Sequence, residues 1–443
     1  MRVCVLQAGS ALVGLGANVA KALAVRSCRS GTCPRVVDSR HVSASDLALG
    51  LEESACPARD LRNESTLLSY QRISNMPTTR RDFLLGSGAL LVGCRSTEQP
   101  QAATHATHPA STSLDAIFLA HAKVLPEKRG AGANHDPMAA EVLEAVGRAG
   151  DIPARWIQRA RSFSGGERLV VPITNWSQAL GHCERYQDWR ACFVHELATG
   201  SWQGVVARWV PRLAPGLSGA LFHGLLRTAH AVRALRRADH PARRGELACG
   251  LAYWAARAQP LRQRLGERRS RFDLAGIDTP WSHDASEVPF DDVMQRVHAE
   301  PLAPEPVLDP PGIRPAERLA AIVRGATEAF LEMIVQRRNT IWLLHAVTGP
   351  AAVELLLPEL DAASSQILVA YAEQACVAVF RAYGAPFEPR ASLRDVTATW
   401  QELFDRAVAL ESVHSIKLLE ALRRFEEHGD PLARAVAVRW LES

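Results

Sequence analysis

The sequence predicts an all-α fold consisting of one irregular domain with many helices. From Leu114 onward, apolar residues recur at spacings of three and four, which is the period of an amphipathic helix. Alanine and leucine are abundant in this part of the chain, and runs of β-branched residues are scarce. Because no internal repeat of fixed period is present, one irregular helical domain is favoured over a solenoid.

Composition excludes several classes of protein. With 443 residues, 47% hydrophobic and 22% charged, the chain is not collagen-like, coiled-coil or fully disordered. No apolar run approaches the ~20 residues that a membrane-spanning helix requires. Residues 1–94 hold 11 Lys/Arg against 7 Asp/Glu, and residues 95–443 hold 40 of each, so the body lacks the positive charge of a nucleic-acid-binding protein. Five of the nine cysteines fall in residues 1–94, and the other four form neither a disulfide scaffold nor a zinc ribbon.

The first 113 residues are expected to lie outside the folded body, and part of them is expected to serve export. Residues 76–94 contain Arg80-Arg81, a short apolar stretch and Leu91-Val92-Gly93-Cys94, which together resemble a twin-arginine signal ending in a lipoprotein cleavage box. Residues 1–75 are either a mis-started reading frame or a disordered extension, and residues 95–113 have the composition of a flexible linker. We therefore expect a periplasmic or cell-surface lipoprotein anchored through Cys94, or a cytoplasmic protein if the signal is not used.

The folded helical body is expected to occupy residues 114–443. Pro315 and Pro350 stand at expected first-turn positions, and Gly384 stands where a helix should end. Residues 168–172 form a short strand-like run, and residues 267–313 form the longest irregular segment, which could be a lid over a pocket. The expected helices are Pro137–Gly147, Pro153–Arg161, Trp176–Thr199, Pro215–Arg237, Arg243–Ala258, Pro315–Val347, Pro350–Tyr383, Leu393–Glu411 and Val413–His428.

Histidines with apolar neighbours occur at four separate sites in this body. They are His135 just before a helix, His223 with His230 along one helix, His345 at the end of an apolar turn, and His414. A single such histidine is more often a satisfied core residue than a ligand. Four sites on four helices favour a metal site, because helical domains build such sites from inward side chains on facing helices.

The spacing of two of these histidines limits what they can do together. His223 and His230 are seven residues apart, about 10.5 Å of helix rise, so one is expected to ligate and the other to orient a ligand or the substrate. An all-imidazole set suits zinc, copper, iron or nickel, and the ligand type does not choose between them.

Lys417 lies three residues after His414 and therefore on the same helix face. In an apolar, histidine-lined cavity its pKa should fall, and the neutral amine could react with CO2 to give a carbamate, an anionic ligand. The alternative is a lysine whose stem packs while its ammonium reaches water.

Several segments, in order, resemble the questin oxidase-like family of aromatic polyketide pathways, including its many bacterial members. The matching motifs cover most of residues 114–430, and they are Asn134-His135-x-Pro-Met138, Trp209-Val-Pro-Arg-Leu-Ala-Pro-Gly216, His223-Gly-Leu-Leu-Arg-Thr-Ala-His230, Glu246-Leu-Ala-Cys-Gly-Leu-Ala-Tyr-Trp254, Leu344-His-Ala-Val-Thr-Gly-Pro350 and His414-Ser-Ile-Lys417.

The resemblance implies an all-helical non-haem iron oxygenase. It assigns Fe(II) to His135, His345, His414, a carboxylated Lys417, and a fourth histidine for which His223 is preferred to His230. Fungal members have a histidine four residues after the first, where this chain has Arg227. Arg227 and Asn134 are candidates for orienting a ligand or the substrate.

The implied reaction is oxidative C–C cleavage of a polycyclic phenolic or quinone-type ring by O2, described either as Baeyer–Villiger oxidation with NADPH or as dioxygen-dependent cleavage. No GxGxxG follows a strand, so NADPH enters only as a transient reductant. Two other interpretations stay open: a non-catalytic metal-binding or sensing lipoprotein, and a structural helical protein. The substrate and oligomeric state are not predicted.

Overall fold

The computed structural model describes residues 113–128, 132–166, 168–261, 263–264, 272–277, 279, 290–299, 303–304, 313–338, 340–388, 396–430 and 432–443. All of these residues belong to one compact unit, Arg59–Ser443. The expected extension (1–75), export signal with Cys94 (76–94) and linker (95–113, except Ser113) lie outside the described residues, as does most of the expected lid.

Where it is described, the chain is all-α, as predicted. The α-helices are α3 (Ser113–His121), α4 (Asp136–Ala145), α5 (Arg155–Arg159), α6 (Trp176–Ala179), α7 (Tyr186–Thr199), α8 (Trp202–Leu213), α9 (His223–Arg237), α10 (Pro241–Arg257), α11 (Phe290–Ala299), α12 (Pro315–Val335), α13 (Thr340–Val353), α14 (Ala362–Tyr383), α15 (Trp400–Ala409), α16 (Val413–Glu427) and α17 (Ala433–Glu442). Short 3-10 turns are η1 (Ala149–Asp151), η2 (Ala160–Phe163), η3 (Cys183–Arg185), η4 (Ala214–Gly216) and η5 (Leu357–Glu359). The strands are an antiparallel pair, β1 (Glu127–Lys128) and β2 (Gly132–Ala133), and a parallel pair, β3 (Gln263–Arg264) and β4 (Ala303–Pro304).

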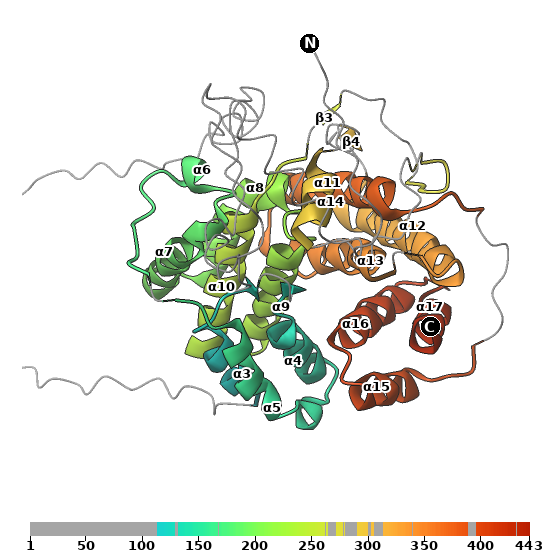
Figure 1. Ribbon diagram of the computed structural model, residues 1–443, viewed down its shortest axis with the longest axis horizontal. Coiled ribbons are helices and arrows are strands. Elements are labelled where there is room, and N and C mark those ends of the chain that lie inside the picture. The colour runs from blue at the N-terminus through green and yellow to red at the C-terminus, as the bar shows by residue number, and fades with distance from the viewer. Residues whose placement is uncertain are drawn as a thin grey trace, which may run out of the picture. The chain divides into compact units, whose positions relative to one another are not determined.

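Four helices form the centre of this fold. α4, α9, α13 and α16 make a closed ring in which each helix contacts the next (Figure 1). The remaining core helices cover the ring from outside: α3 and α10 pack on α4 and α9, α12 and α14 on α13, and α15 and α17 on α16. The ring therefore has little access to solvent except at its ends.

Several predicted helices are shorter than the apolar pattern suggests. The expected helix Pro215–Arg237 begins only at His223, and Pro315–Val347 breaks between Val335 and Thr340, where Arg337 has a φ of 53°. Local backbone conformation, which the apolar period does not record, ends these helices. α3, α8 and α17 are not among the expected helices, and α11 lies inside the segment expected to be irregular.

Pro350 was predicted at the first turn of a helix, but it lies inside α13. A proline there has no N–H for the carbonyl one turn earlier, which belongs to Ala346. The thiol of Cys376 on α14 donates to that carbonyl at 3.6 Å, so the fold supplies a partner.

The strand predicted for residues 168–172 is also wrong. This segment is extended but joins no sheet; Val171 N–H donates to Asp188 on α7 at 2.9 Å, and Arg185 donates to Val171 O at 3.3 Å. Side chains of η3 and α7 thus take the place of a strand partner.

Two segments, Thr340–Glu359 and Ala362–Tyr383, are long and apolar enough to span a membrane, contrary to the sequence-based expectation. Within the fold, 72% and 67% of their most apolar windows are buried against the other helices. Core helices of this kind meet the same criterion.

α9 and α10 approach closely because glycines remove side chains at their contact. A Cβ on Gly250 would lie 2.7 Å from Thr228 N, and one on Gly224 would lie 2.4 Å from Trp254 Cα. These two glycines set the separation of the helix that carries His223 from its neighbour.

Gly250→Ala is therefore expected to lower the free energy of unfolding by about 1–3 kcal/mol, through overpacking against Thr228. Gly245→Ala on the same helix, where a Cβ would meet nothing within 4 Å, is the matched control. It should raise the stability by about 0.5–1 kcal/mol, because alanine loses less backbone entropy. Urea denaturation of both variants checks the prediction, and equal effects would contradict it.

Candidate metal centre

Five of the predicted side chains converge at one end of the four-helix ring. They are His135 at the start of α4, His223 on α9, His345 on α13, and His414 with Lys417 on α16. Nitrogen atoms of His135, His223 and His345 lie within 4.8 Å of one another. The ring of His414 lies 4.2 Å from that of His135 and 5.4 Å from that of His345, measured between centroids. We call these five residues the histidine cluster.

His135 reaches the cluster because α4 begins beside it. His135 is the N-cap residue, and Pro137 occupies a first-turn position where a missing N–H costs nothing. Its Nδ1 lies 2.6 Å from Nζ of Lys417, and its ring centroid lies 4.7 Å from that of His223.

His223 is placed by an unusual turn. The three residues before it, Ala220, Leu221 and Phe222, all have positive φ (51°, 49° and 63°). Each left-handed L-residue costs about 1–2 kcal/mol, so the surrounding structure must hold this turn. The ring of Phe222 packs against Gly349 of α13, where a Cβ on Gly349 would lie 2.5 Å from the ring.

His223 and His345 face each other with defined tautomers. His223 Nδ1 lies 2.5 Å from Ala220 O, and His345 Nδ1 lies 2.8 Å from Ile341 O, so both Nδ1 atoms donate. Burial lowers the pKa of His345 to about 3 and holds that of His223 well below its usual range, so both rings are neutral. Each Nε2 therefore carries a lone pair.

The two Nε2 atoms lie 3.2 Å apart. Two acceptors at this distance repel each other unless something positive lies between or beside them. The two Nε2 atoms can thus donate their lone pairs to a bound cation. The half-buried ring of His135 adds a third nitrogen at the same place. Neutral imidazoles are good ligands for iron, zinc, copper or nickel, so the residues present fit a transition-metal ion.

Lys417 supplies the other functional group of the cluster. Its side chain is 1% exposed, and burial lowers its pKa from 10.5 to about 7, so much of the amine is neutral at neutral pH. The expectation that its ammonium might instead reach water is not met. α16 begins at Val413 with Ser412 as its cap, which places His414 in the first turn and Lys417 one turn later.

The cluster is open on one side. His135 and His414 are half-buried, whereas His223, His345 and Lys417 are buried. These two half-buried rings, at the start of α4 and of α16, therefore form the side of the cluster nearest to solvent.

His230 is not brought to the cluster. Its Nδ1 lies 2.7 Å from Glu141 Oε2 on α4, two helical turns away from His223. Between the two alternatives on this helix, the structure places only His223 beside the other histidines.

The two proposed orienting residues make other contacts. Arg227 forms a buried, two-pronged ion pair with Glu246 on α10, through bonds of 2.6 and 2.8 Å. Asn134 donates to His121 Nδ1 at 2.8 Å, and His121 Nε2 in turn donates to Trp156 O at 2.9 Å. These contacts hold α9 and the start of α4 against α10 and α3; they involve none of the clustered histidines.

The turn at residues 220–222 could not be predicted from the residue types, because alanine, leucine and phenylalanine rarely adopt positive φ. Nor did it identify Glu141, whose pairing with His230 spans 89 residues.

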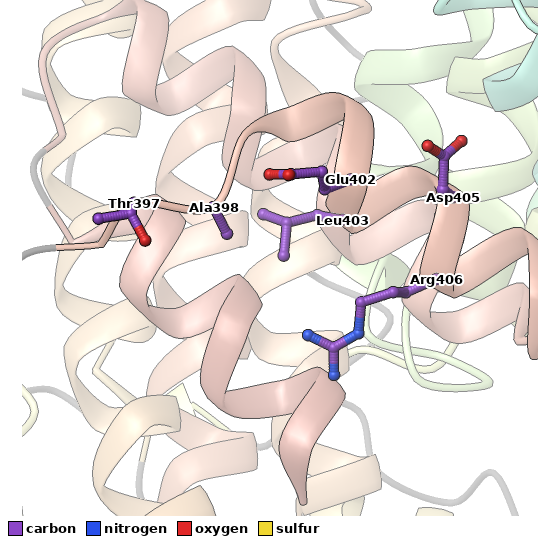
Figure 2. Close-up of a pocket in the computed structure, with 6 residues that line it drawn as sticks. All are labelled: Thr397, Ala398, Glu402, Leu403, Asp405 and Arg406. Carbon is purple, nitrogen blue, oxygen red and sulfur yellow. The ribbon is translucent and has the colours of Figure 1, made fainter.

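A depression of about 720 Å³ lies elsewhere on the described surface, at the start of α15 (Figure 2). No member of the histidine cluster lines it; its lining residues are Thr397, Ala398, Glu402, Leu403, Asp405 and Arg406.

Comparison of the chain with models of known protein families finds no family that matches, and none of the curated proteins matches it significantly.

Proposed function

We propose that this protein is a non-haem iron-dependent oxygenase that uses O2 for oxidative C–C cleavage of a polycyclic phenolic or quinone-type substrate. The observation that carries the proposal is the convergence of neutral imidazoles from four helices, with two Nε2 lone pairs 3.2 Å apart. The resemblance of the motifs around these residues to the questin oxidase-like family supports iron and the reaction class.

His135, His223, His345 and His414 would hold the ion, and the hydrogen bonds from Nδ1 to Ala220 O and Ile341 O would fix two of the rings. When bound, Fe(II) would supply the electrons with which O2 becomes reactive toward an electron-rich ring. The protein itself keeps the donors pre-oriented, and the chain neighbours Phe222, Leu344 and Leu418 are buried apolar side chains.

Lys417 would complete the ligand set as a carbamate. Its neutral amine attacks CO2, a new N–C bond forms, and one proton leaves to solvent or a buffer base. The product is an anionic oxygen donor at the position of a former amine. The lowered pKa of Lys417 favours this reaction, because only the uncharged amine is nucleophilic.

The substrate would approach at the half-exposed edge formed by His135 and His414.

We expect roughly one iron per chain when the protein is purified from iron-supplemented cells. His135→Ala, His414→Ala and His223→Gln should each lose most of it, because each removes a nitrogen donor. Elemental analysis of purified protein measures the effect.

Two other histidines provide the controls. His230→Gln should retain iron, since His230 lies on Glu141, and so should His195→Ala, whose ring is exposed on α7. Iron contents that do not differ between the cluster variants and these controls would contradict the assignment.

For Lys417, the variant Lys417→Ala should lose iron and recover part of it when short carboxylates are added, because they can replace the carbamate oxygens. Wild-type protein equilibrated with 13C-bicarbonate should show a carbamate carbon by NMR that Lys417→Ala lacks. If wild-type protein shows no carbamate resonance and Lys417→Ala keeps its iron, Lys417 is not a ligand.

Activity is tested by O2 uptake with a panel of hydroxylated anthraquinones and related polycyclic phenols. Iron-loaded wild-type protein should consume O2 and transfer label from 18O2 to an opened-ring product, and His135→Ala should show no uptake above buffer. Full iron loading without uptake across the panel, with or without NADPH, would instead favour a metal-binding or sensing protein.

A further inference from the structure

A second polar layer crosses the same four helices below the histidine cluster. We call it the ionic layer, and its members are Glu141 on α4, His230, Arg233 and Arg237 on α9, Glu354 directly after α13, and Glu420 and Arg424 on α16.

The contacts of this layer join every helix of the ring. Glu141 accepts from His230 at 2.7 Å, from Arg233 at 2.6 Å and from Arg237 at 2.9 Å, which connects α4 to α9. Arg233 also pairs with Glu420, which connects α9 to α16.

Arg424 closes the layer on its other side. It donates to Glu420 at 2.6 Å, pairs with Glu354, and donates to Ala351 O at 3.1 Å, which connects α16 to α13. Glu141 and Glu420 are nearly inaccessible, with side chains 0% and 4% exposed.

The two layers are in register along the chain. Glu141, His230, Ala351 and Glu420 follow His135, His223, His345 and His414 by six, seven, six and six residues, respectively. Six or seven residues of α-helix rise by about 9–10.5 Å, so each helix carries its metal-binding residue and its ionic contact at the same separation. On all four helices the chain therefore runs from the histidine cluster toward the ionic layer.

The charges of the layer balance. Three carboxylates, on Glu141, Glu354 and Glu420, face three guanidiniums, on Arg233, Arg237 and Arg424. The neighbouring arginines hold the pKa of the Glu141 carboxyl well below its usual range, against the effect of burial. Such a network satisfies its members only at one rotation and one height of each helix, because guanidinium–carboxylate bonds are directional.

We propose that the ionic layer contains the positioning residues of the metal centre: it fixes the height and rotation of the four helices so that their imidazoles meet at one point. This inference rests on the proposed metal site. Apolar contacts between the helices tolerate small sliding and rotation, whereas a buried ionic network specifies one arrangement even where it adds little net stability.

The experiment measures Co2+ affinity and the Co2+ d–d absorption spectrum of metal-free protein, with stability measured in parallel by urea denaturation. The variants are Glu141→Gln and Glu420→Gln, which keep the side-chain shape and remove the charge. The matched control is Glu373→Gln, which breaks the partly buried pair of Glu373 with Arg318 between α14 and α12, helices that carry no clustered residue.

Both ionic-layer variants should bind Co2+ about 10–100-fold more weakly and show an altered spectrum, as loss of groups that orient metal ligands does elsewhere. Glu373→Gln should lose stability without either change. If Glu141→Gln or Glu420→Gln fails to fold, Arg237→Gln is tested instead, because Arg237 lies at the more exposed rim of the layer. It should also weaken Co2+ binding, by a smaller factor.

Wild-type affinity and spectrum in folded ionic-layer variants would overturn the inference and leave the metal centre intact. If wild-type protein itself bound no metal ion, the proposed function would fail as well, and the layer would be a stability element alone.

Discussion

The structure depends on one unfavourable contact: two imidazole nitrogens with lone pairs, 3.2 Å apart in a buried place. Both lone pairs are fixed there because each opposite nitrogen donates to a backbone carbonyl. Nothing in the packing of apolar side chains favours such a contact. The fold must therefore hold the rings against their mutual repulsion, and a cation between them would turn that repulsion into attraction.

Several features of the fold act against that repulsion. The left-handed turn at Ala220–Phe222 sets the first residue of α9, and Gly349 leaves room for the ring of Phe222. Gly224 and Gly250 let α10 support α9 from behind. Each is a local cost in backbone strain or entropy that the packed helices around the ring offset. Strain gathered next to polar donors is typical of functional sites.

The sequence predicted the helices and the convergence of separate histidines better than it predicted details of backbone. Apolar periodicity located α10 and α16 to within two residues at each end, because their buried faces are long and regular. It could not place the start of α9, since no residue type announces three consecutive positive φ angles. It also left His223 and His230 undecided, because residues seven apart share one helix face. The choice is made by Glu141, on another helix, and helix periodicity carries no information on that contact.

Charge explains why a lysine belongs in this cluster. Three clustered histidines lie at or near the N-terminal ends of their helices, α4, α9 and α16, where unpaired N–H groups concentrate positive potential. Four neutral imidazoles do nothing to offset that potential or the charge of a divalent ion, and among the described residues the group that could hold a metal ion includes no carboxylate. A protonated Lys417 would add to the positive charge. A carbamate on the same nitrogen would change its contribution from +1 to −1, which favours a divalent ion at a place that the helix ends alone would disfavour. Formation of the carbamate and binding of the ion would therefore favour each other, because each lowers the cost of burying the other's charge.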